Sequence, residues 1–119
     1  MTLQLPPHFN RQNGVLHLED VSLQTLAQQY GTPCYVYSAT AIRDAYTSYT
    51  LALKGRKSRV HYALKANSNL SVLKLLKDLG AGFDVVSGGE LACALAVGAA
   101  GADIVFSGVG KSVAEMQAA

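Results

Sequence analysis

The chain has 119 residues, enough for one small domain with its own core. Half of its residues are hydrophobic and 15% are charged, as in globular proteins, and scattered basic residues with a net charge of +2 do not favour nucleic-acid binding. The longest uncharged apolar run, 91–100, is shorter than the ~20 residues that cross a membrane, and the N-terminus lacks the features of a secretory signal. The two cysteines have no metal or redox spacing, so we expect free thiols and a cytoplasmic protein.

The first 37 residues are polar and contain several turn signals, among them Asn13-Gly14 and the segment 31–33. The pattern predicts a short strand at 15–18 and a short helix over 22–30 that ends at Gly31. Residues 34–37, Cys-Tyr-Val-Tyr, predict another strand because aromatic and β-branched residues follow a proline turn.

From Ser38 onward, predicted helices and strands alternate. Helices are expected after the capping residues Ser38, Asn69 and Ser87, and a further helix from Lys111 to the end of the chain. Strands are expected at about 58–65, 83–86 and 104–106. This alternation implies parallel βαβ units and an α/β fold. Three units cannot close a (β/α)₈ barrel, which takes ~250 residues. The chain also ends without a glycine stop, so we expect it to be part of a longer protein.

Lys65 is the first candidate for chemistry, because it lies at the C-terminal end of a predicted strand, where α/β folds place their sites. Alternation places it on one face with His61 and Ala63, and the small Ala63 leaves room for a cofactor. Burial would disfavour the charged ammonium and release a neutral amine that can form an imine with an aldehyde. On position alone, a solvated lysine at a strand end is the preferred interpretation.

Asp84 is the second candidate, because a charge inside an apolar strand is costly unless it is paired. Lys65 on the neighbouring strand is the expected partner, and a simple structural ion pair is the alternative. Glu90 is expected to cap a helix with Ser87 rather than to act in catalysis. His61 is expected to be packed in the core, since no histidine or cysteine is spaced to form a metal site with it.

The segment 107–112, Ser-Gly-Val-Gly-Lys-Ser, ends in the same three letters as a P-loop. A P-loop requires a glycine where this chain has Val105, so the pattern fails. An N-terminal cap of the following helix is the preferred interpretation, and backbone N–H groups that bind an anion remain an alternative.

Four motifs occur in order over nearly the whole chain: the segments 31–38 (GTPCYVYS), 62–67 (YALKAN), 82–91 (GFDVVSGGEL) and 106–112 (FSGVGKS). Together they resemble diaminopimelate decarboxylases, a family of fold-type III enzymes that depend on pyridoxal phosphate. Ornithine and arginine decarboxylases share the lysine at position 65 and the Gly-Phe-Asp segment. The sequences of the second and third motifs are closer to those of the diaminopimelate branch.

The resemblance implies an alanine-racemase-like (β/α)₈ TIM barrel together with a β-rich second domain. Residues 1–37 would contribute to the β-rich domain, and 38–119 would form the first βα units of the barrel. Lys65 would be the lysine that binds pyridoxal phosphate through a Schiff base and the candidate catalytic acid or base, and Asp84 would lie near the cofactor. No metal is implied.

The activity implied by the resemblance is the decarboxylation of meso-2,6-diaminopimelate to L-lysine, the last step of lysine biosynthesis, in a homodimer. The substrate is therefore a small amino acid, and neither nucleic acid nor a membrane is an expected partner. This chain alone is expected to be inactive. The alternatives are an ornithine- or arginine-type decarboxylase, a non-catalytic homologue that binds partners, and a phosphate-binding regulatory module that uses the 107–112 loop.

Overall fold

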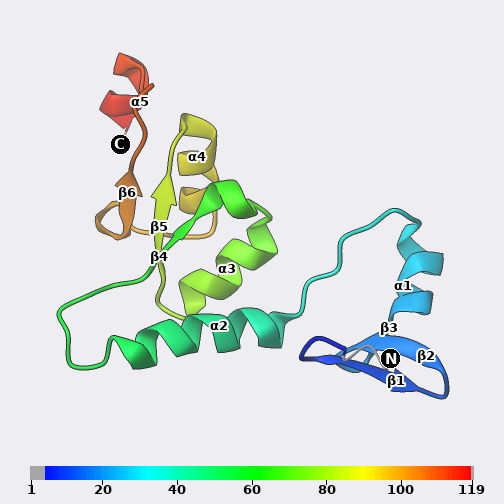
Figure 1. Cartoon of the computed structure of the whole chain (residues 1–119). Coiled ribbons are helices and arrows are strands. Elements are labelled where there is room, and N and C mark those ends of the chain that lie inside the picture. The colour runs from blue at the N-terminus through cyan, green and yellow to red at the C-terminus, as the bar shows by residue number, and fades with distance from the viewer. Residues whose placement is uncertain (1–4, 119) are drawn as a thin grey trace. The chain divides into compact units, whose positions relative to one another are not determined.

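A computed structural model of the chain describes residues 5–118. The chain divides into two compact units, 1–44 and 45–119, and the division falls within helix α2. The expected assignment of residues 1–37 to a β-rich domain stays a prediction. Figure 1 shows the elements, which are, in chain order, β1 (Phe9–Gln12), β2 (Val15–Leu18), β3 (Val21–Ser22), α1 (Leu23–Tyr30), α2 (Ala39–Ala52), β4 (His61–Ala63), the 3₁₀ turn η1 (Leu64–Ala66), α3 (Leu70–Asp78), β5 (Gly82–Val85), α4 (Gly88–Ala96), the 3₁₀ turn η2 (Gly101–Asp103), β6 (Ile104–Phe106) and α5 (Val113–Ala118).

The second unit is built on a parallel sheet with the strand order β4-β5-β6. Ala63 pairs with Asp84, which in turn pairs with Val105. The predicted parallel strands and the helices between them are confirmed, and with them the α/β class. Within residues 5–118, no helix is long and apolar enough to cross a bilayer.

The core of this unit lies between the sheet and the helices that follow its strands. Alternation along β5 buries Phe83 and Val85 completely, and α4 contacts both β5 and β6 (Figure 1). Asp84 and Val86 lie on the other face and are less buried. Other buried apolar side chains come from η1, α3 and α4 and from the residues that follow these two helices: Leu64, Leu73, Leu76, Ala81, Leu91, Ala94, Val97 and Ala99.

Capping residues begin the helices where the sequence predicts them. The side chain of Asn69 accepts a hydrogen bond from the backbone N–H of Ser71 at 2.9 Å, and that of Ser38 accepts one from Ala41 at 2.9 Å. These bonds satisfy N–H groups that have no partner inside a helix. Gly80 follows α3 with a φ of 95°, a conformation that favours glycine and ends the helix.

Two expectations about the first strand of this sheet are wrong. The predicted strand 58–65 pairs only over His61–Ala63, and Lys65 falls in the 3₁₀ turn η1. The alternation that was expected to align Lys65 with His61 and Ala63 therefore ends at Ala63. His61 is exposed rather than packed in the core, because β4 is an edge strand of the described sheet and the His61 ring lies over Gly82.

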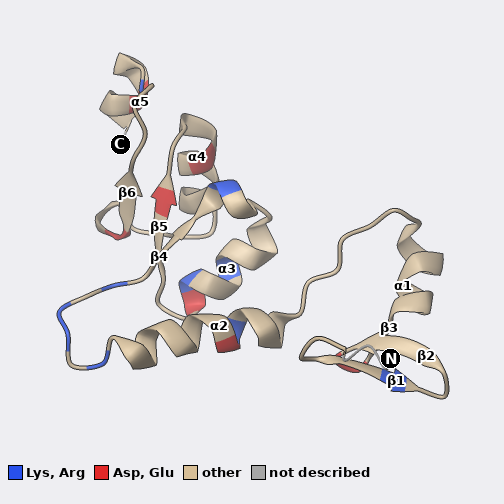
Figure 2. Ribbon diagram, viewed as in Figure 1, with Lys and Arg blue, Asp and Glu red and all other residues tan. Residues whose placement is uncertain are grey.

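Basic residues gather along the segment that joins α2 to β4 (Figure 2). Four of the ten lysines and arginines of the chain lie between positions 54 and 59. Arg59 hydrogen-bonds and ion-pairs with Asp103, which precedes β6. The bond therefore joins the segments before β4 and β6, the two outer strands of this three-stranded sheet.

The first unit contains a small antiparallel sheet with the order β1-β2-β3 and the helix α1. Asn13 and Gly14 both have positive φ, 51° and 83°, as the tight turn between β1 and β2 requires. The predicted strand 15–18 and helix 22–30 are confirmed, and the Ser22 side chain caps α1 by accepting from Thr25.

The predicted strand at Cys34–Tyr37 is wrong. These residues pair with no strand in the part of the chain that the structure describes, and Tyr35 is 92% exposed. The rings of Tyr35 and Tyr37 stack with centroids 6.5 Å apart, as side chains two residues apart can do in extended backbone. Propensity favours an extended conformation here, but a strand also requires a partner for its backbone groups.

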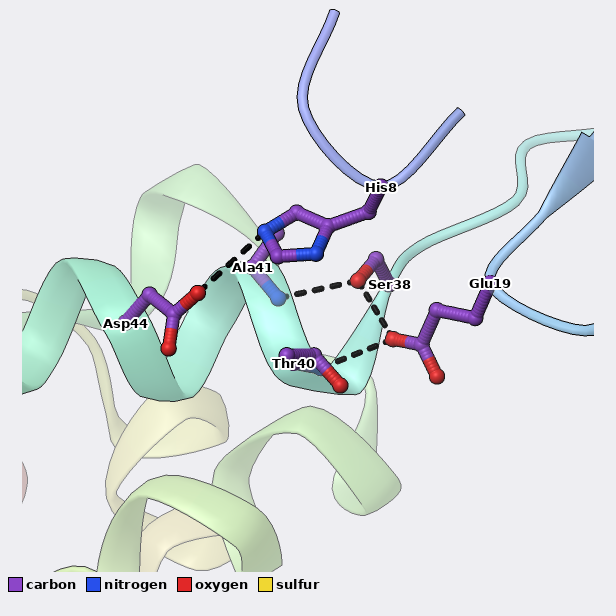
Figure 3. A network of polar contacts seen from close by, with 6 residues as sticks. All are labelled: His8, Glu19, Ser38, Thr40, Ala41 and Asp44. Carbon is purple, nitrogen blue, oxygen red and sulfur yellow. Dashed lines mark hydrogen bonds and ion pairs between the residues drawn. The ribbon is translucent and has the colours of Figure 1, made fainter. Parts of the chain in front are cut away.

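Glu19 connects the turn after β2 to the beginning of α2 (Figure 3). Its carboxylate accepts hydrogen bonds from the Ser38 hydroxyl and from the backbone N–H of Thr40. These two bonds, the first being the stronger cause, lower the pKa of Glu19 below its usual range. His8 also forms an ion pair with Asp44, with 3.3 Å between Nε2 and Oδ2.

Candidate functional site at the carboxyl ends of the strands

Three polar residues mark the carboxyl edge of the parallel sheet. Lys65 follows β4 by two residues, Asp84 lies within β5, and Ser107 comes directly after β6. Because neighbouring strands run in the same direction, the ends of all three meet at one edge. This is the edge at which the sequence places its candidate site.

Lys65 is held by the backbone of the turn that carries it. Leu64 anchors η1 in the core with 1% of its surface exposed, and the Tyr62 hydroxyl donates to the carbonyl oxygen of Asn67 at 3.1 Å. The Lys65 side chain is exposed, and among residues 5–118 its amine takes part in no hydrogen bond or ion pair. The described residues thus fix the position of Lys65 without occupying or burying its amine.

Asp84 is paired, but its partner is not Lys65. The Ser107 hydroxyl donates to Asp84 Oδ1 at 2.6 Å. The expected ion pair between Lys65 and Asp84 is wrong, because Lys65 lies in a turn beyond the paired part of β4 while β6 pairs directly with β5. Ser107 was missed as a site residue, although its place immediately after a predicted strand could have indicated it.

Glu90 has the capping role that the sequence favours. Its backbone N–H donates to the Ser87 hydroxyl at 3.2 Å, and its carboxylate accepts from the backbone N–H of Val86 at 2.8 Å. Both bonds are local to the beginning of α4. They account for Glu90 without a catalytic role.

A second capping box, at Ser112 and Glu115, was not recognised in the sequence although it repeats the Ser-x-x-Glu spacing of Ser87 and Glu90. The Glu115 carboxylate accepts from the backbone N–H of Ser112 at 2.9 Å and from that of Gly88 at 2.8 Å. Hydrogen bonds from these N–H groups and from the Ser112 hydroxyl lower the pKa of Glu115 below its usual range. One carboxylate therefore joins the beginnings of α4 and α5.

The loop 107–112 does not present its lysine to a ligand. Lys111 Nζ donates to the carbonyl oxygens of Phe106, Ser107 and Gly108 at 3.2, 3.2 and 2.8 Å, and it lies 5.2 Å from the centroid of the Phe106 ring. A P-loop lysine points at a phosphate instead. The geometry agrees with the missing glycine at position 105 and favours a structural loop.

Metal-binding geometry does not occur at this edge. Within residues 5–118, no group of three or more histidine, cysteine, aspartate or glutamate side chains could hold a metal ion. The two cysteines, Cys34 and Cys93, are free thiols. Among the described residues, the charged side chains near the carboxyl edge are those of Lys65, Asp84 and Lys111 and of the capping glutamates Glu90 and Glu115.

Comparisons with known proteins identify a pyridoxal-binding domain in this chain. Residues 39–119 match the family model described as "Pyridoxal-dependent decarboxylase, pyridoxal binding domain". The chain is 50% identical to the diaminopimelate decarboxylase of Pseudomonas fluorescens over 111 residues, which cover 93% of this chain and 27% of that protein.

Solved structures of decarboxylases also match the chain. The diaminopimelate decarboxylase of M. jannaschii in complex with L-lysine matches with a TM-score of 0.87 and 37% identity, over 92% of this chain and 27% of that one. The lysine decarboxylase of Selenomonas ruminantium matches with a TM-score of 0.75 and 30% identity, over 87% of this chain and 27% of that one.

The fold and the matched domain define a pyridoxal-binding α/β domain of the TIM-barrel decarboxylases. The chain belongs to the family of pyridoxal-dependent decarboxylases. It spans about a quarter of the length of the relatives that it matches. The resemblance to this family on the four sequence motifs is confirmed.

Proposed function

We propose that this chain forms the front part of a pyridoxal-phosphate-dependent carboxy-lyase that converts meso-2,6-diaminopimelate into L-lysine and CO₂. This reaction would be the last step of lysine biosynthesis. The relatives with about 50% identity carry the name of that enzyme, and the related M. jannaschii structure contains L-lysine. The activity requires the complete protein, because the chain spans only about a quarter of those relatives.

Lys65 is the observation that carries the proposal. Its turn lies at the carboxyl edge of the sheet, Leu64 fixes that turn in the core, and its amine has no partner within residues 5–118. A lysine that is positioned by its backbone but left free at Nζ can bond covalently to the aldehyde of pyridoxal phosphate. Lys111, by contrast, donates hydrogen bonds from Nζ to the three backbone carbonyl groups at the end of β6 and the start of its own loop.

The residues at this edge fit pyridoxal phosphate at its aldehyde end. Lys65 would hold the aldehyde carbon. Asp84 would lie near the cofactor, with the Ser107 hydroxyl fixing one of its carboxylate oxygens and leaving the other without a hydrogen bond among the described residues. When bound, pyridoxal phosphate supplies an electron sink for the pair that remains when CO₂ leaves. Lys65 Nζ would also accept or donate a proton at this place.

The test is the replacement of Lys65 by alanine in the complete protein that contains this chain. We expect the variant to lose the absorbance band of the lysine-bound cofactor and the release of CO₂ from meso-diaminopimelate. Lys57→Ala is the matched control, because Lys57 is also exposed and forms no ion pair within residues 5–118. A Lys65→Ala variant that retained both the band and full turnover would refute the assignment.

A decarboxylase that acts on a basic amino acid is the second candidate. The match to the Selenomonas ruminantium lysine decarboxylase supports it, but its identity of 30% is well below the 50% reached with the Pseudomonas fluorescens relative. Measuring CO₂ release from meso-diaminopimelate, L-lysine, L-ornithine and L-arginine separates the candidates. Absence of CO₂ release from all four would favour a non-catalytic homologue.

The assembly and location are proposed together with the activity. We infer a homodimer in the cytoplasm, with residues 1–37 contributing to a β-rich domain. The small three-stranded sheet in this segment supports the domain assignment, and the free thiols of Cys34 and Cys93 support a reducing compartment. Sedimentation of the complete protein would test the dimer.

A further inference from the structure

A pocket lies at the other edge of the parallel sheet, before the strands begin. It has a volume of about 330 Å³ and is lined by the end of α2, the segment that leads into β4, and Gly80, which precedes β5. This volume is in the range of small-molecule sites. Lys65 follows the opposite ends of the same strands, so the pocket does not depend on the proposed decarboxylase site.

From its charges and donors, we propose that this pocket binds a compact, multiply charged phosphate anion, such as a free polyphosphate or the phosphate end of a small metabolite. Lys54, Arg56 and Arg59 line it, and no acidic residue does. Asp103 partly neutralises Arg59. Among the described residues, Lys54 and Arg56 form no ion pair, which leaves two uncompensated positive charges at the pocket.

The Tyr46 hydroxyl adds a hydrogen-bond donor to these charges. Thr50 and Ser58 also line the pocket, but their hydroxyls already donate to the carbonyl oxygens of Thr47 and Arg56, at 3.0 and 3.4 Å. The Tyr46 hydroxyl lies 3.7 Å from where a Cβ on Gly80 would be, and it makes no hydrogen bond with the described residues. Gly80 has a φ of 95°, a conformation that favours a residue without a side chain, so no side chain from this position fills the pocket.

The combination favours phosphate over other anions. An arginine fork and a lysine ammonium can share the several oxygens of a phosphate, and more than one cation is needed to balance its charge. A single carboxylate would leave part of this positive charge unbalanced. A nucleic acid needs a basic track along its backbone, whereas the uncompensated charges here are gathered around one pocket.

The test is equilibrium dialysis of the 119-residue chain against labelled inorganic pyrophosphate at low ionic strength, which measures binding whatever the association state of the chain. We expect saturable binding of one pyrophosphate per chain. Arg56→Gln and Lys54→Gln should each weaken it about fivefold, the effect of removing one charge at ~4 Å in water. Both side chains are exposed, so neither substitution removes a core contact.

Lys57→Gln is the matched control. Lys57 belongs to the same basic segment and carries the same charge, but it does not line the pocket. We expect this variant to bind pyrophosphate as the unmodified chain does, within a factor of two. Equal weakening by all three substitutions would show diffuse attraction to the basic segment and overturn the proposal, and so would a lack of saturable binding. Inorganic phosphate and ATP, dialysed in parallel, distinguish a free polyphosphate from a phosphorylated metabolite.

Discussion

Replacement of Gly82 by alanine tests how closely the three strands approach one another at the beginning of the sheet. A Cβ at this position would lie 2.4 Å from His61 Cδ2 and 2.8 Å from the carbonyl oxygen of Asp103. Carbon atoms in good contact are ~3.5–4.0 Å apart, so both neighbours would have to move. The exposed His61 ring can rotate. The Asp103 carbonyl belongs to the backbone of η2, which is held in place because the backbone N–H of Asp103 donates to the carbonyl oxygen of Ala100.

The expected cost follows from two opposing effects. Overpacking of this kind costs about 1–3 kcal/mol, and the lower entropy of the unfolded chain with alanine offsets about 0.4–1 kcal/mol. We therefore expect Gly82→Ala to destabilise the chain by about 1–2 kcal/mol. With an unfolding entropy of about 2.1 cal/mol/K per residue, the Tm should fall by roughly 4–8 °C.

Thermal unfolding followed by circular dichroism measures this change. Gly101→Ala is the matched control, because a Cβ there would meet nothing within 4 Å. The double variant His61→Ala/Gly82→Ala should recover only part of the loss, since the Asp103 carbonyl remains in the way. An unchanged or raised Tm for Gly82→Ala would refute the close approach. Full recovery in the double variant would show that the Asp103 carbonyl moves away at little cost and that the clash with the His61 ring causes the whole loss of stability.

Three other predictions concern acid stability, association and cofactor affinity. The hydrogen-bonded Glu19 has a lowered pKa, so its stabilising contribution is present above pH 4.5 and is lost as the pH falls through the folded-state pKa. Glu19→Gln, unlike Asp20→Asn, should lower the Tm at pH 7, and this loss should shrink as the pH falls below 4.5. Exposed apolar side chains on β6 and α5, including Val105, Val113 and Met116, should make the 119-residue chain self-associate, and light scattering from a stable monomer would contradict this. This chain should bind pyridoxal phosphate no better through Lys65 than through Lys57, as reduction with borohydride and peptide mapping would reveal.

Local signals were sufficient to predict most of the second unit. Ser38, Asn69 and Ser87 cap helices because their side chains bond N–H groups only two or three residues away. Gly80 ends a helix because of its own φ. Such effects act within a few residues, so the sequence contains all that they require.

Features that depend on a distant partner were the ones predicted wrongly. Residues 34–37 have strand propensity, but no strand pairs with them in the described chain. Asp84 needs a polar partner, and the choice of Ser107 over Lys65 depends on where β4 stops pairing and on which strand adjoins β5. Sequence alternation cannot locate the residue at which a strand becomes a turn, and that residue decides which way Lys65 points.

The two edges of the parallel sheet differ in how much of a site the described residues build. At the starting edge, the pocket and all its lining residues belong to the second unit, so the isolated chain contains everything that the proposed anion site requires. At the carboxyl edge, Lys65 is positioned but exposed, and its amine has no partner among the described residues, whereas Asp84 and Ser107 are joined to each other. The described residues therefore build only part of the proposed cofactor site. The proposed chemistry of Lys65, unlike the anion site, has to be measured in the complete protein.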